Sequence, residues 1–284
     1  MMDLLRSVRD RRVPLKEAAR ILRTGVVLTG RDLRFDIHRY ERTGLPEVVL
    51  AEGKTPEAFG RILRRLHQLE LPVVASRLRA EHETVIRDLQ KDGLPLKAFP
   101  VSRLASCCGD RLRPILGGHR AAVLAAGTSD VAVAQEAADF LGLLGADVET
   151  AYDVGVAGLH RLVSALTRLR QRNCEVYVVM AGREGALPTV VAGLVDRPVI
   201  GVPVSVGYGR GAGGESALTA MLQSCAPLAV VNIDGGIPAA MVASQIMRQR
   251  PRRPRLVRAR PARSGRSSGP RPDRSSRARK AGRP

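Results

Sequence analysis

The sequence predicts an α/β fold in three parts. A doubly wound, three-layer domain with a parallel sheet is expected over 119–250, a smaller N-terminal α/β domain and linker over 1–118, and a disordered basic tail over 251–284. In the central part, short β-branched runs alternate with longer helical patterns, which is typical of βαβ units. The expected strands also end in glycines or short polar residues, as the ligand-binding edge of a parallel sheet does.

The central domain is expected to hold five strands and five helices. The strands are 121–127, 147–152, 174–182, 198–204 and 228–234. The helices are 131–145, 159–170, 186–195, 213–225 and 237–250. Helices on both faces would bury the sheet, and right-handed crossovers would bring the carboxyl ends of the strands to one edge. We therefore expect the functional site at that edge.

The N-terminal part carries a weaker pattern. Helical spacing covers 14–22, and strand-like runs cover 46–53 and 71–77. A further helix is expected from Thr55 to Leu69, because Thr is a favoured N-cap and the proline that follows fits the first helical position. The mixed region 92–118 is expected to contain the linker.

The net charge of +19 lies mostly in the tail. Residues 248–284 hold 14 Arg, one Lys and one Asp, so they carry 14 of the 19 net charges. This segment cannot bury enough apolar surface to offset its ordering entropy. It could bind nucleic acid through counterion release, but the body has few aromatics and no matching motif. We therefore expect non-specific tail contacts at most.

Composition also bears on location and metals. No apolar run is long enough to span a membrane, and the charged N-terminus lacks the apolar core of a secretory signal. The cysteines are Cys107, Cys108, Cys174 and Cys225. Neither the cysteines nor the histidines have metal-ligand spacing, so we expect free thiols, no metal site and a cytoplasmic protein. His67 and His82 lie in polar helical patterns and are expected to be solvated.

Two loops at the expected carboxyl edge carry candidate binding groups. The segment Gly127–Asp130 joins a strand to a helix, and its amides with the hydroxyls of Thr128 and Ser129 could hold a phosphate at the positive helix end. It could equally be an ordinary helix cap. His160 and Arg161 follow a glycine-rich turn and could reach a phosphate or carboxylate, or form a surface pair.

Three further features could carry chemistry. Glu184, two residues after Gly182, is a candidate base or substrate ligand, although a carboxylate at a helix start is also stabilised by the helix dipole. The glycine-dense loop 207–214 could be a binding lid or a flexible connection. Cys225, at a Pro-bounded junction, could expose a thiol, whereas Cys174 is expected in the core.

Three long blocks resemble one family, the LarB-type nickel-pincer nucleotide biosynthesis carboxylases. They are AAGTSDVAVAQ…GLHRL (125–162), VVMAGREGALP…VNIDGG (178–236) and DIHRYERTGLPEVVLAEGKTPE (36–57). The resemblance covers most of 15–247. It implies a PurE-like, flavodoxin-like C-terminal domain and, because PurE-like relatives assemble as octamers, a homo-oligomer between dimer and octamer.

The resemblance also implies an activity. The family carboxylates carbon 5 of the pyridinium ring of nicotinic acid adenine dinucleotide and hydrolyses the phosphoanhydride. The products are pyridinium-3,5-biscarboxylic acid mononucleotide and AMP, in the first step towards the nickel-pincer cofactor of lactate racemase. Carbon dioxide or bicarbonate is then the co-substrate, and no tightly bound cofactor is expected. Mg²⁺ would neutralise the diphosphate, but no dedicated metal cage is visible.

Matching motifs imply the site residues. Cys225, in SCAP, is the nucleophile, and Glu184, in AGREGALP, is the base. The substrate-binding residues are then Thr128, Ser129, Asp130, Asp153, His160, Arg161 and Gly182. A thiolate is needed because an electron-poor pyridinium cannot attack carbon dioxide, whereas its thiolate adduct is an enamine that can.

Two other functions stay open. One is a PurE-like aminoimidazole ribonucleotide carboxylase or mutase, whose corresponding loop carries a histidine where this chain has Glu184. The other, from a different class, is a nucleic-acid-binding protein that uses the Arg-rich tail.

Overall fold

The computed structural model describes most of the chain outside the tail. The described residues are 2–19, 27–30, 33–36, 39–107, 112, 114–207 and 209–249. All of them fall within one compact unit, Met1–Arg253. The tail that the sequence predicts to be disordered, 251–284, lies outside the described residues.

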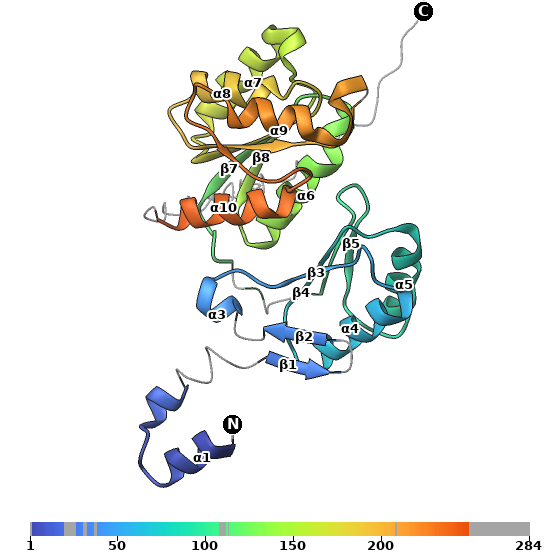
Figure 1. The fold of residues 1–284 in the computed structure, drawn as a ribbon, viewed down its shortest axis with the longest axis vertical. Coiled ribbons are helices and arrows are strands. Elements are labelled where there is room, and N and C mark those ends of the chain that lie inside the picture. The colour runs from blue at the N-terminus through green and yellow to red at the C-terminus, as the bar shows by residue number, and fades with distance from the viewer. Residues whose placement is uncertain are drawn as a thin grey trace, which may run out of the picture. The chain divides into compact units, whose positions relative to one another are not determined.

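The C-terminal half is built on a five-stranded sheet (Figure 1). Its strands are β7 (Arg120–Ala125), β8 (Asp147–Ala151), β9 (Val176–Ala181), β10 (Val199–Pro203) and β11 (Ala229–Val230). The order is β11-β10-β9-β7-β8, and every pair is parallel. All five predicted strands are therefore confirmed. Chain order reverses between β7 and β9, which makes that position the switch point of the sheet.

Helices cover both faces of this sheet, as predicted (Figure 1). They are α6 (Val131–Leu143), α7 (Leu159–Gln171), α8 (Ala186–Leu194), α9 (Glu215–Leu222) and α10 (Gly236–Arg248). Val123 and Val178 pack with α6 and α10, whereas their neighbours Leu124 and Val179 pack with α7, α8 and α9. Because both of their faces are buried, β9 and β10 carry no charged side chain, whereas the edge strand β8 alternates between apolar and polar residues.

A buried carboxyl group joins α6 to α10. Glu136, on α6, is 7% exposed, and its Oε2 accepts a hydrogen bond from the amide of Ile237 at 3.3 Å. Burial raises the pKa of Glu136 to about 7. The close approach requires a glycine at the start of α10, because a Cβ on Gly236 would lie 2.6 Å from Glu136 Oε2 and 2.7 Å from the carbonyl oxygen of Val133.

The N-terminal half contains a second, four-stranded sheet and a hairpin. The strands are β1 (Val27–Gly30), β2 (Leu33–Asp36), β3 (Val48–Leu50), β4 (Val73–Ser76), β5 (Lys97–Phe99) and β6 (Leu104–Cys107). The helices are α1 (Met2–Arg9), α3 (Arg39–Thr43), α4 (Pro56–Gln68) and α5 (Ala80–Lys91). The sheet order is β3-β4-β6-β5, with β3 and β4 parallel and the other pairs antiparallel. Strands β1 and β2 pair antiparallel.

Several N-terminal expectations are confirmed. Helix α4 begins where predicted, and the Thr55 hydroxyl accepts a hydrogen bond from the amide of Ala58 at 3.3 Å. Strands β3 and β4 lie inside the predicted runs, and residues 15–19 are helical. The region expected to hold the linker, however, also contributes β5 and β6 to the sheet.

The prediction that His82 is solvated is wrong. His82 is fully buried, and its Nε2 lies 3.0 Å from the carbonyl oxygen of Lys54. Its Nδ1 accepts a hydrogen bond from the amide of Arg79 at 3.1 Å, and its ring packs edge-on against Phe59. Polar neighbours in the sequence conceal this, because only one side of α5 faces the core.

The chemical inventory of the described residues is simple. Among the described cysteines, Cys107 and Cys174 are buried, which confirms the core placement of Cys174, and Cys225 is exposed. Cys108 lies outside the described residues. Across the same ranges, no helix has the length and apolarity that a membrane crossing requires.

Candidate active site

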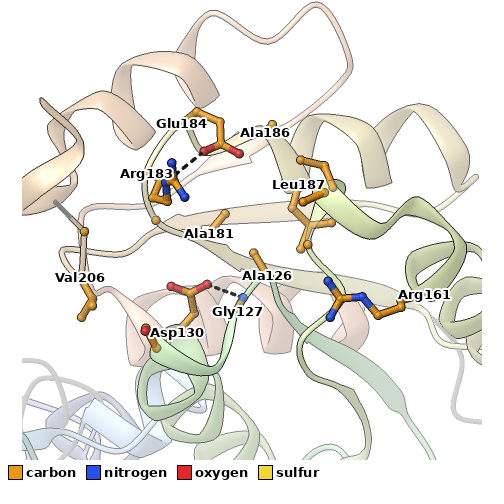
Figure 2. A pocket seen from close by; sticks show the side chains of 16 residues that line it. Ala126, Gly127, Asp130, Arg161, Ala181, Arg183, Glu184, Ala186, Leu187 and Val206 are labelled. Carbon is orange, nitrogen blue, oxygen red and sulfur yellow. Dashed lines mark hydrogen bonds and ion pairs between the residues drawn. The ribbon is translucent and has the colours of Figure 1, made fainter. Parts of the chain in front are cut away.

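A cavity of about 370 Å³ opens at the carboxyl edge of β7 and β9, where the chain order reverses. Its volume lies in the range of small-molecule sites. It is lined by Ala126, Gly127, Ser129, Asp130, Gly155, Val156, Ala157, Arg161, Ala181, Gly182, Arg183, Glu184, Ala186, Leu187, Val206 and Gly207 (Figure 2). Five of the residues implied by sequence thus meet in one cavity: Ser129, Asp130, Arg161, Gly182 and Glu184.

The turn after β7 supplies the first wall. The short polar run Thr128–Asp130 forms a 3₁₀ turn that leads directly into α6. Asp130 is 5% exposed, and its Oδ2 accepts a hydrogen bond from the amide of Gly127 at 2.8 Å (Figure 2). Burial raises the pKa of Asp130, although the hydrogen bonds from Gly127 and Gly182 oppose this. Thr128 is exposed and does not line the cavity.

The turn after β9 supplies the opposite wall. A Cβ on Gly182 would lie 2.6 Å from the carbonyl oxygen of Val206, so no larger residue fits without a backbone shift. Glu184 follows, with its Oε2 4.0 Å from Arg183 Nε (Figure 2). Both side chains are more than 60% exposed, so this ion pair is weak and leaves the carboxylate able to meet a ligand.

The segment that follows β8 supplies a cation. Arg161, in the first turn of α7, lines the cavity and forms an ion pair with Asp153, the residue at a left-handed φ of +57° shortly after β8. Asp153 does not itself line the cavity, so its contact is with Arg161. His160, the other residue implied there, is exposed and also lies outside the lining.

Cys225 does not line this cavity. Helix α9 starts after the loop that follows β10, at the carboxyl edge, and runs back to the amino edge before β11 begins. Cys225 lies between α9 and β11, so it sits at the amino edge. The thiol and Glu184 of one chain therefore lie at opposite edges of the sheet.

The sequence places Arg183 and Val206 at the carboxyl ends of expected strands but assigns neither a role, and both line the cavity. Sequence reasoning did not single out Val156 and Leu187, which also line it. Gly207 begins the glycine-dense loop and Val206 directly precedes it, so that loop borders the cavity. No group of three or more His, Cys, Asp or Glu within the described ranges could hold a metal ion.

Two family models match this architecture. Residues 120–258 match AIR carboxylase, and residues 30–106 match the LarB/PurE-like N-terminal domain. A doubly wound sheet with a cavity at its switch point, matched in this way, defines an AIR carboxylase-type α/β protein. With the N-terminal match, the chain belongs to the LarB-type proteins with a PurE-like domain, which confirms the resemblance seen in the sequence.

Individual relatives fall into two groups. An uncharacterised protein from Methanocaldococcus jannaschii is 38% identical over 219 residues, 76% of this chain and 84% of that protein. The N5-carboxyaminoimidazole ribonucleotide mutase of the same organism is 33% identical and covers 42% of this chain and 73% of its own length. The mutase of Pyrococcus abyssi is 32% identical over 46% of this chain and 75% of its own length. These mutases thus match less than half of the chain.

Proposed function

We propose that this protein is an enzyme that carboxylates carbon 5 of the pyridinium ring of nicotinic acid adenine dinucleotide and hydrolyses its phosphoanhydride. The products are pyridinium-3,5-biscarboxylic acid mononucleotide and AMP. The observation that supports this most is the cavity at the switch point, with Glu184 on its wall, in a chain that joins the LarB/PurE-like N-terminal domain to an AIR carboxylase domain.

The carboxylation proceeds in four steps. The Cys225 thiolate adds to carbon 4 of the ring, which converts the pyridinium into a neutral dihydropyridine. Carbon 5, now the nucleophilic end of an enamine, bonds to the carbon of carbon dioxide. Glu184 removes the proton from carbon 5, and the electron pair of that bond restores the aromatic ring as the thiolate leaves. The anhydride is cleaved separately by water, which ends up on the phosphates of the two products.

The remaining wall residues bind and orient the substrate. Arg161 can neutralise a phosphate or carboxylate, and Asp153 holds its guanidinium at the cavity. Ser129 and the amides near it offer donors at the start of a helix. Mg²⁺ could bind together with the diphosphate, since such ions are commonly held by one or two carboxylates and the substrate phosphates. None of the four carboxylation steps depends on it.

This mechanism requires at least two chains, in line with the expected homo-oligomer. Since Cys225 and Glu184 of one chain lie at opposite edges of the sheet, the thiol at each cavity has to come from a second copy. The surroundings of Cys225 suit a contact between copies, because the neighbouring Leu222 is 67% exposed.

One incubation tests the proposal. The purified full-length chain is mixed with nicotinic acid adenine dinucleotide and ¹³C-bicarbonate, and the products are read by mass spectrometry. We expect AMP and a mononucleotide that has gained one labelled carboxylate. Cys225→Ala should form none of it while keeping its melting temperature. Labelled product from Cys225→Ala at the wild-type rate would rule out the thiolate route.

The mutase relatives favour a second candidate, N5-carboxyaminoimidazole ribonucleotide mutase activity. Against it, those proteins match less than half of this chain, and Glu184 stands in the active-site loop where we expect a histidine in such enzymes. Turnover of that ribonucleotide, with no turnover of the dinucleotide, would decide for the mutase.

A further inference from the structure

A second cavity, of about 160 Å³, adjoins the first. The two share Ser129 and Val206 among their walls, so a ligand in one can continue into the other. The second cavity is distinguished by three arginines of the N-terminal half: Arg77, Arg79 and Arg103. We call it the arginine cleft.

Two of these arginines are held at the same edge of the N-terminal sheet. Arg77 directly follows β4 and Arg103 directly precedes β6, and these strands pair antiparallel. The amide of Leu78 donates a 3.0 Å hydrogen bond to the carbonyl oxygen of Arg103, which ties the two turns together. Both arginines adopt left-handed backbone, at φ +54° and +51°. Such strain in non-glycine residues gathers at functional sites.

The acidic groups of the cleft already have donors. Glu52 accepts hydrogen bonds from Arg77 at 3.1 Å and from Arg79 at 3.4 Å. Asp234 Oδ1 accepts one from the amide of Ser205 at 2.9 Å.

Glu136, the third acid, accepts one from an α10 amide, and burial brings its pKa to about 7, so it is partly protonated at neutral pH. Within the part of the chain that the structure describes, Arg103 has no side-chain hydrogen bond or ion pair. Its charge lowers the pKa of Glu136, but its guanidinium N–H groups remain available to donate to a ligand in the cleft.

Arg103 also lines a third cavity, of about 130 Å³. That cavity has an apolar wall that includes Leu78, Ile86 and Phe99. Shared wall residues therefore connect the three cavities in series. The first is lined by Glu184, the second is rich in arginine and the third is largely apolar. A dinucleotide has the same sequence of parts, with a pyridinium ring, an anionic diphosphate and a flat adenine base.

We propose that the arginine cleft binds the AMP half of the dinucleotide and that Arg103 donates hydrogen bonds to its phosphate. The inference rests on the proposed function, since a dinucleotide must be the substrate. It also explains why the chain carries an N-terminal half. The relatives named as ribonucleotide mutases match less than half of this chain, and the cations for a second nucleotide come from the N-terminal sheet.

Binding measurements on the full chain test this without requiring turnover. AMP and nicotinic acid mononucleotide are titrated separately into wild type, Arg103→Gln, Arg103→Lys and Arg65→Gln by calorimetry. Arg65 lies exposed on α4 and lines none of the three cavities, so Arg65→Gln is a control with the same charge change.

We expect Arg103→Gln to weaken AMP binding about ten-fold or more, because a charge-assisted hydrogen bond is lost. Its affinity for the mononucleotide should be unchanged, Arg103→Lys should retain part of the AMP affinity, and Arg65→Gln should match wild type. Equal AMP affinity in Arg103→Gln and wild type would overturn the inference, as would equal loss for both ligands. If the proposed function itself is wrong, the wild-type protein will form no labelled product in the incubation with ¹³C-bicarbonate.

Discussion

Glu136 shows how a single buried carboxyl group couples stability to pH. Its folded-state pKa of about 7 lies above the ordinary value of 4.5. A raised pKa means that the protonated form is favoured in the folded state. The stability that this contributes is complete below about pH 4.5 and is lost as the pH rises through about 7.

The Glu136→Gln variant should therefore lose this part of the pH dependence, because Gln stays neutral and can still accept the hydrogen bond from Ile237. Relative to wild type, we expect a gain in the free energy of unfolding of up to about 3 kcal/mol at pH 8 and almost none at pH 4. Urea denaturation at both pH values measures it. Glu215→Gln, an exposed change on α9, is the control, and a pH-independent difference for Glu136→Gln would contradict the assignment.

Glu184 is exposed, so its replacement tests chemistry rather than folding. We expect Glu184→Gln to lower kcat by roughly 10²- to 10⁴-fold, the usual contribution of a general base. Melting temperature should not change, since the ion pair that Glu184 forms with Arg183 is exposed and weak. Product formation under saturating substrate measures the effect. An undiminished kcat would remove Glu184 from the proton transfer.

Residues at strand ends could be predicted from sequence, because the βαβ pattern fixes which loops share an edge. That reasoning brought Ser129, Asp130, Gly182 and Glu184 to one cavity. The same pattern also predicts which edge Cys225 occupies. Cys225 lies between a helix and the strand that follows it, and such connections lie at the amino edge of the sheet. The family resemblance indicated its role but not its edge.

At the scale of elements, strands with a clear pattern of apolar residues in the sequence could be predicted, and strands without one could not. In the C-terminal sheet, β9 and β10 are continuous buried runs rich in β-branched residues, and β8 alternates between apolar and polar residues, so both patterns could be recognised between the helices. Strand β5, by contrast, has three residues, Lys97–Phe99, of which two are exposed, and it carries no clear alternation. Its pairing with β6, and that of β6 with β4, joins distant segments. The edge that holds Arg77 and Arg103 could not be foreseen for this reason.

Gly182 allows a test of the loop after β9. We expect Gly182→Ala to lower the free energy of unfolding by about 1–3 kcal/mol and to weaken substrate binding, because the new Cβ would meet the carbonyl oxygen of Val206. Thermal melting and calorimetry measure both effects. Gly193→Ala on α8 is the matched control. A Cβ on Gly193 would have no heavy atom within 4 Å, so Gly193→Ala should raise the free energy of unfolding by about 0.5–1 kcal/mol. Equal behaviour of the two variants would be incompatible with this geometry.

At the scale of the whole molecule, the separation of Cys225 from Glu184 predicts complementation. Alone, Cys225→Ala should be inactive, and Glu184→Gln should keep at most about one hundredth of the wild-type kcat. When the two are unfolded together and refolded as mixed assemblies, some cavities receive an intact thiol and an intact carboxylate, so activity should return. Labelled-product formation is the measurement, and native mass spectrometry confirms the mixing. Inactive assemblies of verified mixed composition would show that both groups act within one chain.

The two edge strands of the five-stranded sheet limit how copies of the chain can associate. At one border, β11 engages its neighbour through just two residues, Ala229 and Val230. At the other, β8 carries charged side chains that are tied up in ion pairs, Asp147 with Arg120 and Glu149 with Arg168. Short or charged borders discourage strand-to-strand addition. A growing ribbon of sheets is thereby disfavoured, so we expect copies of the chain to associate through surfaces other than these strand edges.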